Sequence, residues 1–136
     1  MSEPIAFIGL GAMGGPMALN IIKKGTNLSV YDIEKEKMQP HIKSGAIPGN
    51  SIKDTVEDAE IIVTMLPSTE NVKSVITEPD GVLSYIKPGS IILDMSTIAP
   101  TGTDEIYEIC KQKDVDFIAV SYTHLTLPTI AKEEIS

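Results

Sequence analysis

Three glycines near the N-terminus are the residues best suited to bind a charged ligand. Gly9, Gly11 and Gly14 form a GxGxxG pattern between the apolar run 5–8 and the segment 16–24, which has the features of a helix. Glycines in a strand-to-helix turn let the backbone approach a pyrophosphate, and the positive end of the helix dipole attracts its charge. The pattern alone also fits a tight, closely packed turn, but its position between strand and helix favours a phosphate cradle.

An acidic residue follows at the distance that such a cradle requires. Asp32 ends the apolar run 28–31, about 20 residues after the glycines, where a carboxylate accepts hydrogen bonds from an adenosine ribose. The alternative role for Asp32 is to cap the following helix. Flavin enzymes and methyltransferases also use a glycine-rich first turn, so the turn alone leaves the cofactor open. Methyltransferases are disfavoured because Phe7 and Ile8 stand where they place an acidic residue.

Two later strand ends carry further candidate residues. Leu66 and Pro67 follow the apolar run 61–65, and Ser96 and Thr97 follow the run 91–93. Ligands of open α/β sheets bind at the carboxyl ends of the strands, which makes these positions candidates for ligand contacts. Ordinary roles are the alternative, with Pro67 starting a helix and the two hydroxyls serving as turn or cap residues.

The elements that would position these residues alternate along the chain. We expect strands at 5–8, 28–31, 46–47, 61–65, 91–93 and from 117, and helices at 16–24, 34–44 with an interruption near Pro40, 51–56 capped by Ser51, 68–76, 81–86, and from Thr101 or Thr103 to 112. Parallel strands need crossover connections, and right-handed crossovers place helices on both faces of the sheet. The sequence therefore predicts a single α/β domain with a doubly wound parallel sheet, the Rossmann architecture.

Composition narrows the possible partners. The chain has 136 residues, 42% of them hydrophobic, and a net charge of −8, so we expect a folded domain that binds neither nucleic acid nor an anionic membrane. All basic residues are lysines. The single Cys110 and the distant His41 and His124 predict no disulfide and no metal site, and without a signal or membrane segment we expect a cytoplasmic protein.

With these residues set out, the chain resembles the N-terminal domain of the β-hydroxyacid dehydrogenase family. The matching stretches are 7–20, 30–32, 64–67 and 94–98, and together they span residues 5–118 in the family's order. The 3-hydroxyisobutyrate dehydrogenases are the most similar branch, the tartronate semialdehyde reductases are close behind, and 6-phosphogluconate dehydrogenase is a further member. The resemblance implies an oxidoreductase that transfers a hydride between a nicotinamide cofactor and a small 3-hydroxy acid.

The resemblance also implies roles for individual residues. Asp32 would contact the adenosine ribose, Ser96 would help hold the substrate carboxylate, and the other cofactor contacts would come from Gly9, Leu10, Gly11, Ala12, Met13, Gly14, Leu66, Pro67, Asn71 and Thr97. Of these, Leu66, Pro67 and Asn71 would line the path toward the nicotinamide. No catalytic residue is expected in this chain, because the family's general acid–base Lys belongs to a later, all-helical domain.

Residues 119–136 depart from the family pattern. The family continues with Asp-Ala-Pro-Val-Ser-Gly-Gly, whereas this chain continues with Ala-Val-Ser-Tyr-Thr-His. That stretch resembles a translated sequencing adapter, so we expect a dinucleotide-binding domain at 1–118 and a non-family tail at 119–136. A natural, non-catalytic nucleotide-binding module is the alternative. We expect the chain alone to bind cofactor without turnover, and the intact enzyme to be a homo-oligomer.

The residues after Asp32 predict which nicotinamide cofactor is preferred. NADP-dependent members of the family carry Asn-Arg-Ser or Asn-Arg-Thr where this chain has Asp32, Ile33 and Glu34. Two carboxylates therefore stand where a 2′-phosphate would lie, and like charges repel. Lys35 and Lys37 are the nearby cations, and neither offers the two-pronged contact of an arginine. We expect NAD to bind better than NADP.

Overall fold

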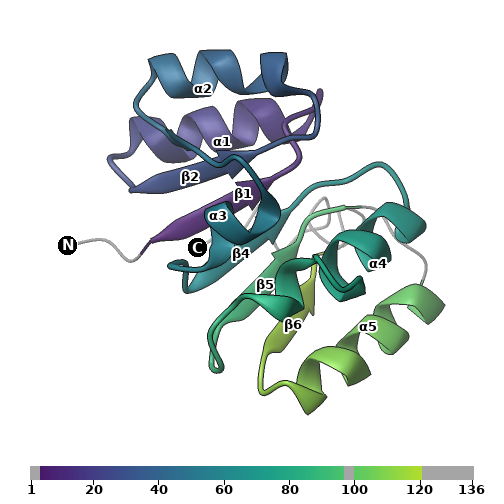
Figure 1. Cartoon of the computed structure of the whole chain (residues 1–136). Helices are drawn as coiled ribbons and strands as arrows, with labels where there is room; N and C mark the ends of the chain where they lie inside the picture. Colours follow the sequence, from purple (N-terminus) through teal and green to yellow (C-terminus); the bar gives the residue numbers. More distant parts are fainter. Residues whose placement is uncertain (1–3, 97–99, 121–136) are drawn as a thin grey trace, which may run out of the picture.

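Six parallel strands form a single sheet in the computed structural model, which describes residues 4–96 and 100–120 (Figure 1). The sheet order is β3-β2-β1-β4-β5-β6. The strands are β1 (Ile5–Ile8), β2 (Leu28–Tyr31), β3 (Ile47–Pro48), β4 (Ile61–Thr64), β5 (Ile91–Asp94) and β6 (Asp116–Ala119). The chain runs outward from β1 to one edge and then from β4 to the other, which confirms the predicted doubly wound architecture.

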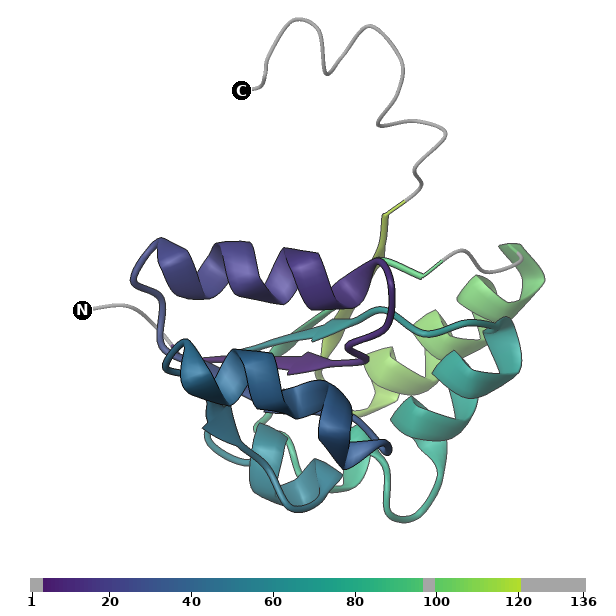
Figure 2. The same cartoon turned by 90° about the horizontal axis from the view of Figure 1, so that it is seen from above.

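Helices cover both faces of this sheet. The helical elements are α1 (Gly14–Lys23), η1 (Lys35–Met38), α2 (Gln39–Lys43), α3 (Ile52–Val56), α4 (Thr69–Thr77), η2 (Val82–Ser84) and α5 (Pro100–Gln112), where η denotes a 3₁₀ helix. Figures 1 and 2 show α1 on one face and α4 and α5 on the other. Packing places α2 on the α1 side, where Ile42 contacts the core cluster of Phe7 and Ala18, and α3 on the other side. None of the helices in the described ranges is both long and apolar enough to cross a membrane.

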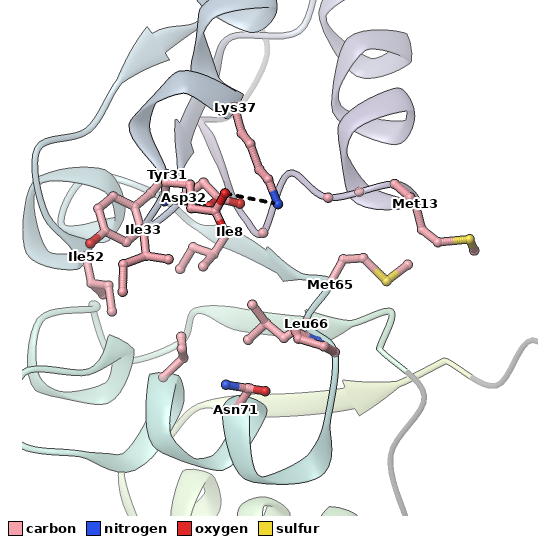
Figure 3. Close-up of a pocket in the computed structure, with 17 residues that line it drawn as sticks. Ile8, Met13, Tyr31, Asp32, Ile33, Lys37, Ile52, Met65, Leu66 and Asn71 are labelled. Carbon is pink, nitrogen blue, oxygen red and sulfur yellow. Dashed lines mark hydrogen bonds and ion pairs between the residues drawn. The ribbon is translucent and has the colours of Figure 1, made fainter.

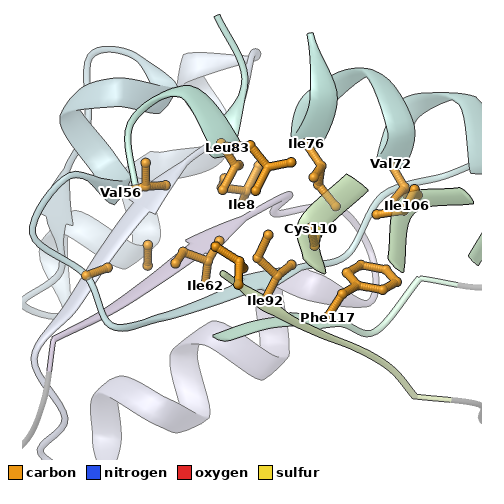
Figure 4. Packing of buried hydrophobic residues seen from close by; sticks show 14 residues of the cluster. Ile8, Val56, Ile62, Val72, Ile76, Leu83, Ile92, Ile106, Cys110 and Phe117 are labelled. Carbon is orange, nitrogen blue, oxygen red and sulfur yellow. The ribbon is translucent and has the colours of Figure 1, made fainter. Parts of the chain in front are cut away.

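Successive residues of a strand point to opposite faces of the sheet and so belong to two separate core clusters. Phe7 packs with Ala18 of α1, whereas Ile8 belongs to the cluster that α3, α4 and α5 cover. In that second cluster Ile62 and Ile92 from the sheet meet Ile76, Ile106 and Cys110 from the helices (Figure 4). Because side chains on both faces are buried, these strands are apolar at successive positions, as the sequence indicated.

Local signals in the sequence explain most helix boundaries. The expected helix at 34–44 is divided into η1 and α2, and Pro40 lies in the first turn of α2, where its missing N–H is not needed. Ser51 caps α3 as predicted, because its hydroxyl oxygen accepts a hydrogen bond of 3.1 Å from the Asp54 amide. Gly25 ends α1 with a φ of 86°, in the left-handed region that glycine tolerates.

Two predicted helices differ from the structure. The expected helix at 81–86 is only the three-residue η2, and Pro88 disfavours helical backbone at Lys87, beyond the expected helix. The helix expected to be capped by Thr101 or Thr103 begins earlier, at Pro100, so both threonines lie inside α5. A proline in the first turn is a common helix start.

Candidate functional site

A cleft of about 530 Å³ opens at the carboxyl ends of β1, β2 and β4 (Figure 3). It lies where the strand order reverses, the usual ligand position in an open α/β sheet, and its size is typical of small-molecule sites. The lining residues come from the turn at residues 9–14, called the glycine turn below, from the ends of β1 and β2, from η1, α3 and α4, and from the segment after β4. They are Ile8, Gly9, Gly11, Ala12, Met13, Gly14, Tyr31, Asp32, Ile33, Glu34, Lys37, Ile52, Met65, Leu66, Pro67, Asn71 and Val75.

The three glycines of the turn meet different structural demands. Gly9 has a φ of 102°, and a Cβ there would collide with the carbonyl oxygen of Met65. A Cβ on Gly14 would collide with the carbonyl oxygen of Gly9. Gly11 has no positive φ, and a Cβ placed on it would meet no described atom within 4 Å. The fold therefore requires glycine at positions 9 and 14, whereas nothing described in the protein requires it at position 11.

Asp32 is anchored on the glycine turn. Its Oδ2 accepts a hydrogen bond of 2.8 Å from the Leu10 amide, and its Oδ1 accepts one of 2.8 Å from the Glu34 amide. Asp32 is not the cap of the next helix, because η1 begins at Lys35 with Glu34 at the N-cap position. A carboxylate can accept about four hydrogen bonds, so the half-buried Asp32 retains acceptor capacity at the edge of the cleft.

The other charged side chains of the cleft are Glu34 and Lys37. The Lys37 ammonium nitrogen lies 3.6 Å from Glu34 Oε1, and Figure 3 shows Lys37 directed toward Asp32. Lys35, the second cation considered from the sequence, is not among the residues that line the cleft. The side chains of the pair are 41% and 55% exposed, so water screens their attraction and the pair adds little stability.

Leu66, Pro67 and Asn71 all line the same cleft as Asp32. Leu66 is half-buried and Pro67 and Asn71 are exposed, and Asn71 is directed toward the cleft (Figure 3). The Asn71 side-chain oxygen accepts a hydrogen bond of 2.7 Å from the Ser68 hydroxyl, which fixes its orientation.

Sequence reasoning missed the apolar side of the cleft. Tyr31, Ile52 and Val75 line it, and Ile33, which is 84% exposed, adds a further apolar side chain. These residues come from β2, α3 and α4 and share no motif, so only the folded chain brings them together. Facing apolar side chains suit a flat aromatic ring.

Ser96, the first of the two candidate hydroxyl residues after β5, lies apart from the other candidates. Ser96 is 2% exposed and does not line the cleft. Its hydroxyl donates a hydrogen bond of 2.7 Å to Asp94 Oδ1 and accepts one of 2.6 Å from the Leu66 amide. Thr97 lies outside the described residues.

Asp94 is the buried carboxyl at the centre of this network. Its Oδ1 also accepts a hydrogen bond of 2.6 Å from the Thr64 hydroxyl, and its Oδ2 has no hydrogen-bond partner among the described residues. Burial raises the pKa of Asp94, and the hydrogen bonds from Thr64 and Ser96 oppose that rise only in part.

This raised pKa predicts how stability depends on pH. The folded chain holds the Asp94 proton more tightly than the unfolded chain, whose carboxyl titrates near 3.8, so stability is lost as pH rises from that value through the raised pKa. We expect the free energy of unfolding of the wild type, measured relative to Asp94→Asn by urea titration, to fall by at most about 1.4 kcal/mol per pH unit across this window. A difference that stays constant or grows with rising pH would contradict the assignment.

Within residues 4–96 and 100–120, no group of three or more His, Cys, Asp or Glu residues could hold a metal ion. Cys110 is fully buried in the core, and burial raises the pKa of its thiol to about 11. A thiol with so high a pKa is a poor nucleophile at neutral pH.

Comparison with known proteins identifies relatives over most of this chain. The family model that describes the NAD binding domain of 6-phosphogluconate dehydrogenase matches residues 4–121. The NAD-dependent L-serine dehydrogenase of Pseudomonas aeruginosa is 38% identical over 111 residues, which are 82% of this chain and 37% of that protein. The mitochondrial 3-hydroxyisobutyrate dehydrogenase of Rattus norvegicus is 41% identical over 103 residues, which are 76% of this chain and 31% of that protein.

A solved structure has the same fold. The 3-hydroxyisobutyrate dehydrogenase of Mycobacterium tuberculosis, determined with L-serine, superposes with a TM-score of 0.81 at 28% identity, covering 88% of this chain and 40% of that one. The chain thus spans only 31–40% of the length of these three relatives.

Proposed function

The chain belongs to the family of the NAD-binding domain of 6-phosphogluconate dehydrogenase, and on this premise we propose that its cleft holds the dinucleotide along the glycine turn, with Asp32 at the adenosine ribose. The backbone amides that follow Gly11 would hold the pyrophosphate. Tyr31, Ile52 and Val75 offer an apolar surface for the adenine ring.

The open space at Gly11 is the observation that carries this proposal. The space above its Cα is open toward the cleft, and neither backbone conformation nor packing calls for a glycine there. A glycine that the fold does not need is explained by a ligand whose phosphate must approach the backbone closely. Gly14 complements it, because its close contact with Gly9 sets the start of α1, whose N-terminal amides would face the pyrophosphate.

Asp32, Leu66 and Asn71 would each have a part in holding the cofactor. Asp32, fixed by the Leu10 amide, keeps acceptor capacity for the ribose hydroxyls. Leu66 and Asn71 line the cleft opposite Asp32 and would contact the dinucleotide there. The nicotinamide ring, when bound, supplies or accepts a hydride.

The reaction served by this domain is also part of the proposal. We propose that the whole protein transfers a hydride between the nicotinamide cofactor and a small 3-hydroxy acid, as the names of the relatives suggest. Hydride transfer to a carbonyl also needs a proton donor beside the developing alkoxide, and we assign no described residue to that role. Ser96 as a substrate ligand, and association into a homo-oligomer, remain proposals drawn from the family resemblance.

We further propose that the dinucleotide-binding domain comprises residues 1–118 and that 119–136 is a tail foreign to the family. Strand β6 includes Ala119, and the Val120 amide donates a hydrogen bond of 2.8 Å to the Asp94 carbonyl, so the first two residues of the tail continue the sheet. Sequencing the source gene across this junction tests the proposal. A genomic sequence that encodes these same residues would overturn it.

The cofactor preference tests the assignment of Asp32. We expect the wild type to bind NADH about tenfold more tightly than NADPH, because a repulsion of about 1.4 kcal/mol between the 2′-phosphate and the carboxylates of Asp32 and Glu34 corresponds to that factor. The double variant Asp32→Asn, Ile33→Arg should reverse the order. Fluorescence titration measures both affinities, and Lys35→Gln, outside the cleft, serves as the control. Equal or tighter NADPH binding by the wild type would show that Asp32 does not face the ribose.

A further inference from the structure

The segment that follows β4 is held in place by a side chain from the segment that follows β5. Thr64 and Asp94 are paired as the last residues of β4 and β5. Beyond them the backbone ladder closes with one hydrogen bond of 2.7 Å, from the Met95 amide to the Thr64 carbonyl. The Leu66 amide comes next, and it donates to the Ser96 hydroxyl at 2.6 Å. A side chain thus continues the contact between the two strands after the backbone pairing has ended.

Asp94 sets the orientation of the Ser96 hydroxyl. A serine hydroxyl has one hydrogen to donate, and Asp94 Oδ1 accepts it at 2.7 Å. The lone pairs of the Ser96 oxygen are thereby turned toward the Leu66 amide. Asp94 is fully buried and Ser96 is 2% exposed, so water does not compete for these hydrogen bonds. Because the acceptor is Oδ1, this arrangement serves both the ionised carboxylate and an acid protonated on Oδ2.

Leu66 connects this network to the cofactor cleft. Its side chain lines the cleft, and its Cδ2 lies 3.1 Å from the place that a Cβ on Gly9 would occupy (Figure 3). The carbonyl of Met65, one residue earlier, blocks the same place. The exit of β4 is therefore packed directly on the first glycine of the turn, and a shift of Leu66 would alter both the wall of the cleft and the support of Gly9.

We propose that Asp94 and Ser96 are positioning residues for the cofactor cleft, in which Asp94 orients the Ser96 hydroxyl and Ser96 holds the Leu66 amide against the glycine turn. This inference rests on the proposed dinucleotide site and adds residues that do not line it. The role that it gives Ser96 is internal to the protein and does not depend on a contact between Ser96 and a substrate.

Thr64 offers a matched control for Ser96. Both hydroxyls are buried and donate to the same oxygen of Asp94, at 2.6 and 2.7 Å, but of the two it is Ser96 that accepts the hydrogen bond from the Leu66 amide. Ser96→Ala and Thr64→Val each remove one such hydrogen bond. A purely structural role predicts similar losses of cofactor affinity for both, whereas a positioning role predicts a loss that is specific to Ser96→Ala.

The experiment measures the affinity for NADH, the urea midpoint and the hydrogen exchange of the Leu66 amide in the 136-residue chain. We expect Ser96→Ala to weaken NADH binding about fivefold, the equivalent of one hydrogen bond of about 1 kcal/mol, and to speed exchange at Leu66. Thr64→Val should stay within about twofold of wild type in affinity, a change of less than half of that free energy, and keep Leu66 protected. Asp94→Leu, which removes the acceptor of the Ser96 hydroxyl, should weaken NADH binding and speed exchange at Leu66 as Ser96→Ala does.

The outcomes separate this proposal from the one on which it rests. If the wild type binds NADH but Ser96→Ala and Thr64→Val weaken it equally, or if Leu66 exchange is unchanged in Ser96→Ala, the positioning role is overturned while the cofactor site stands. If the wild type does not bind NADH, the proposed function fails and this inference fails with it.

Discussion

Gly11→Ala should abolish most cofactor binding without destabilising the protein. The added methyl group enters space that is open toward the cleft, meets no described atom within 4 Å and needs no unusual φ. In the proposed complex it would push the pyrophosphate away from the backbone amides. Losing one charge-assisted hydrogen bond of about 1.5 to 3 kcal/mol weakens binding roughly tenfold to a hundredfold. NADH titration by fluorescence measures the loss.

The stability of the Gly11→Ala variant is the second part of this prediction. Replacing a glycine that has no positive φ reduces the entropy of the unfolded chain, so we expect the free energy of unfolding to stay level or rise by about 0.4 to 1 kcal/mol. Urea titration checks this. A Gly11→Ala chain that binds NADH as tightly as the wild type would remove the observation that carries the proposed function.

Gly9→Ala should cause the largest loss of stability of any substitution considered. Alanine at a φ of 102° costs about 1 to 2 kcal/mol, and the collision of its Cβ with the Met65 carbonyl adds about 1 to 3 kcal/mol. Together these costs are a large share of the total stability of a small domain, which is about 5 to 15 kcal/mol. We expect the urea midpoint to fall sharply, and NADH binding to be lost as well because the glycine turn is displaced.

Gly25→Ala is the control for the backbone part of that cost. Gly25 also has a positive φ, 86°, but a Cβ there meets no described atom within 4 Å, and Gly25 is not among the lining residues of the cleft. It should cost only the conformational share, about 1 to 2 kcal/mol, and leave the NADH affinity unchanged. If Gly9→Ala and Gly25→Ala destabilise the chain equally, the close approach of Met65 to Gly9 contributes nothing to the stability lost in Gly9→Ala.

The sequence predicted the architecture because local and long-range signals agreed. Apolar runs such as 61–65, buried on both faces, have few alternatives to a central parallel strand, and Ser51 and Gly25 marked helix boundaries that the structure contains. The boundaries that were wrong depended on competing local effects. The helix expected at 81–86 is only η2, and Pro100 starts α5 ahead of the threonines expected to cap it.

The candidate site could be predicted only where a motif marks it. The glycine turn, Asp32 and Leu66 are recognisable in the sequence because their spacing is set by the strand ends. The structure places them at one cleft, except for Leu10 of the turn, which was expected to contact the cofactor and is buried in the core. Ile52 and Val75 reach the same cleft from helices whose packing no local pattern specifies. The hydrogen bond from the Leu66 amide to Ser96 joins residues 30 positions apart and is likewise invisible before folding.

The most direct test of the cofactor site is to locate bound NADH residue by residue. In ¹H–¹⁵N spectra of the 136-residue chain, titration with NADH should shift the amide signals of Gly11, Ala12 and Asp32, and those of Leu66 and Asn71 across the cleft. The exposed Tyr107 on α5 lies outside the cleft and should be unaffected. Spectra that do not change, or changes confined to α5 and residues away from the glycine turn, would contradict the account.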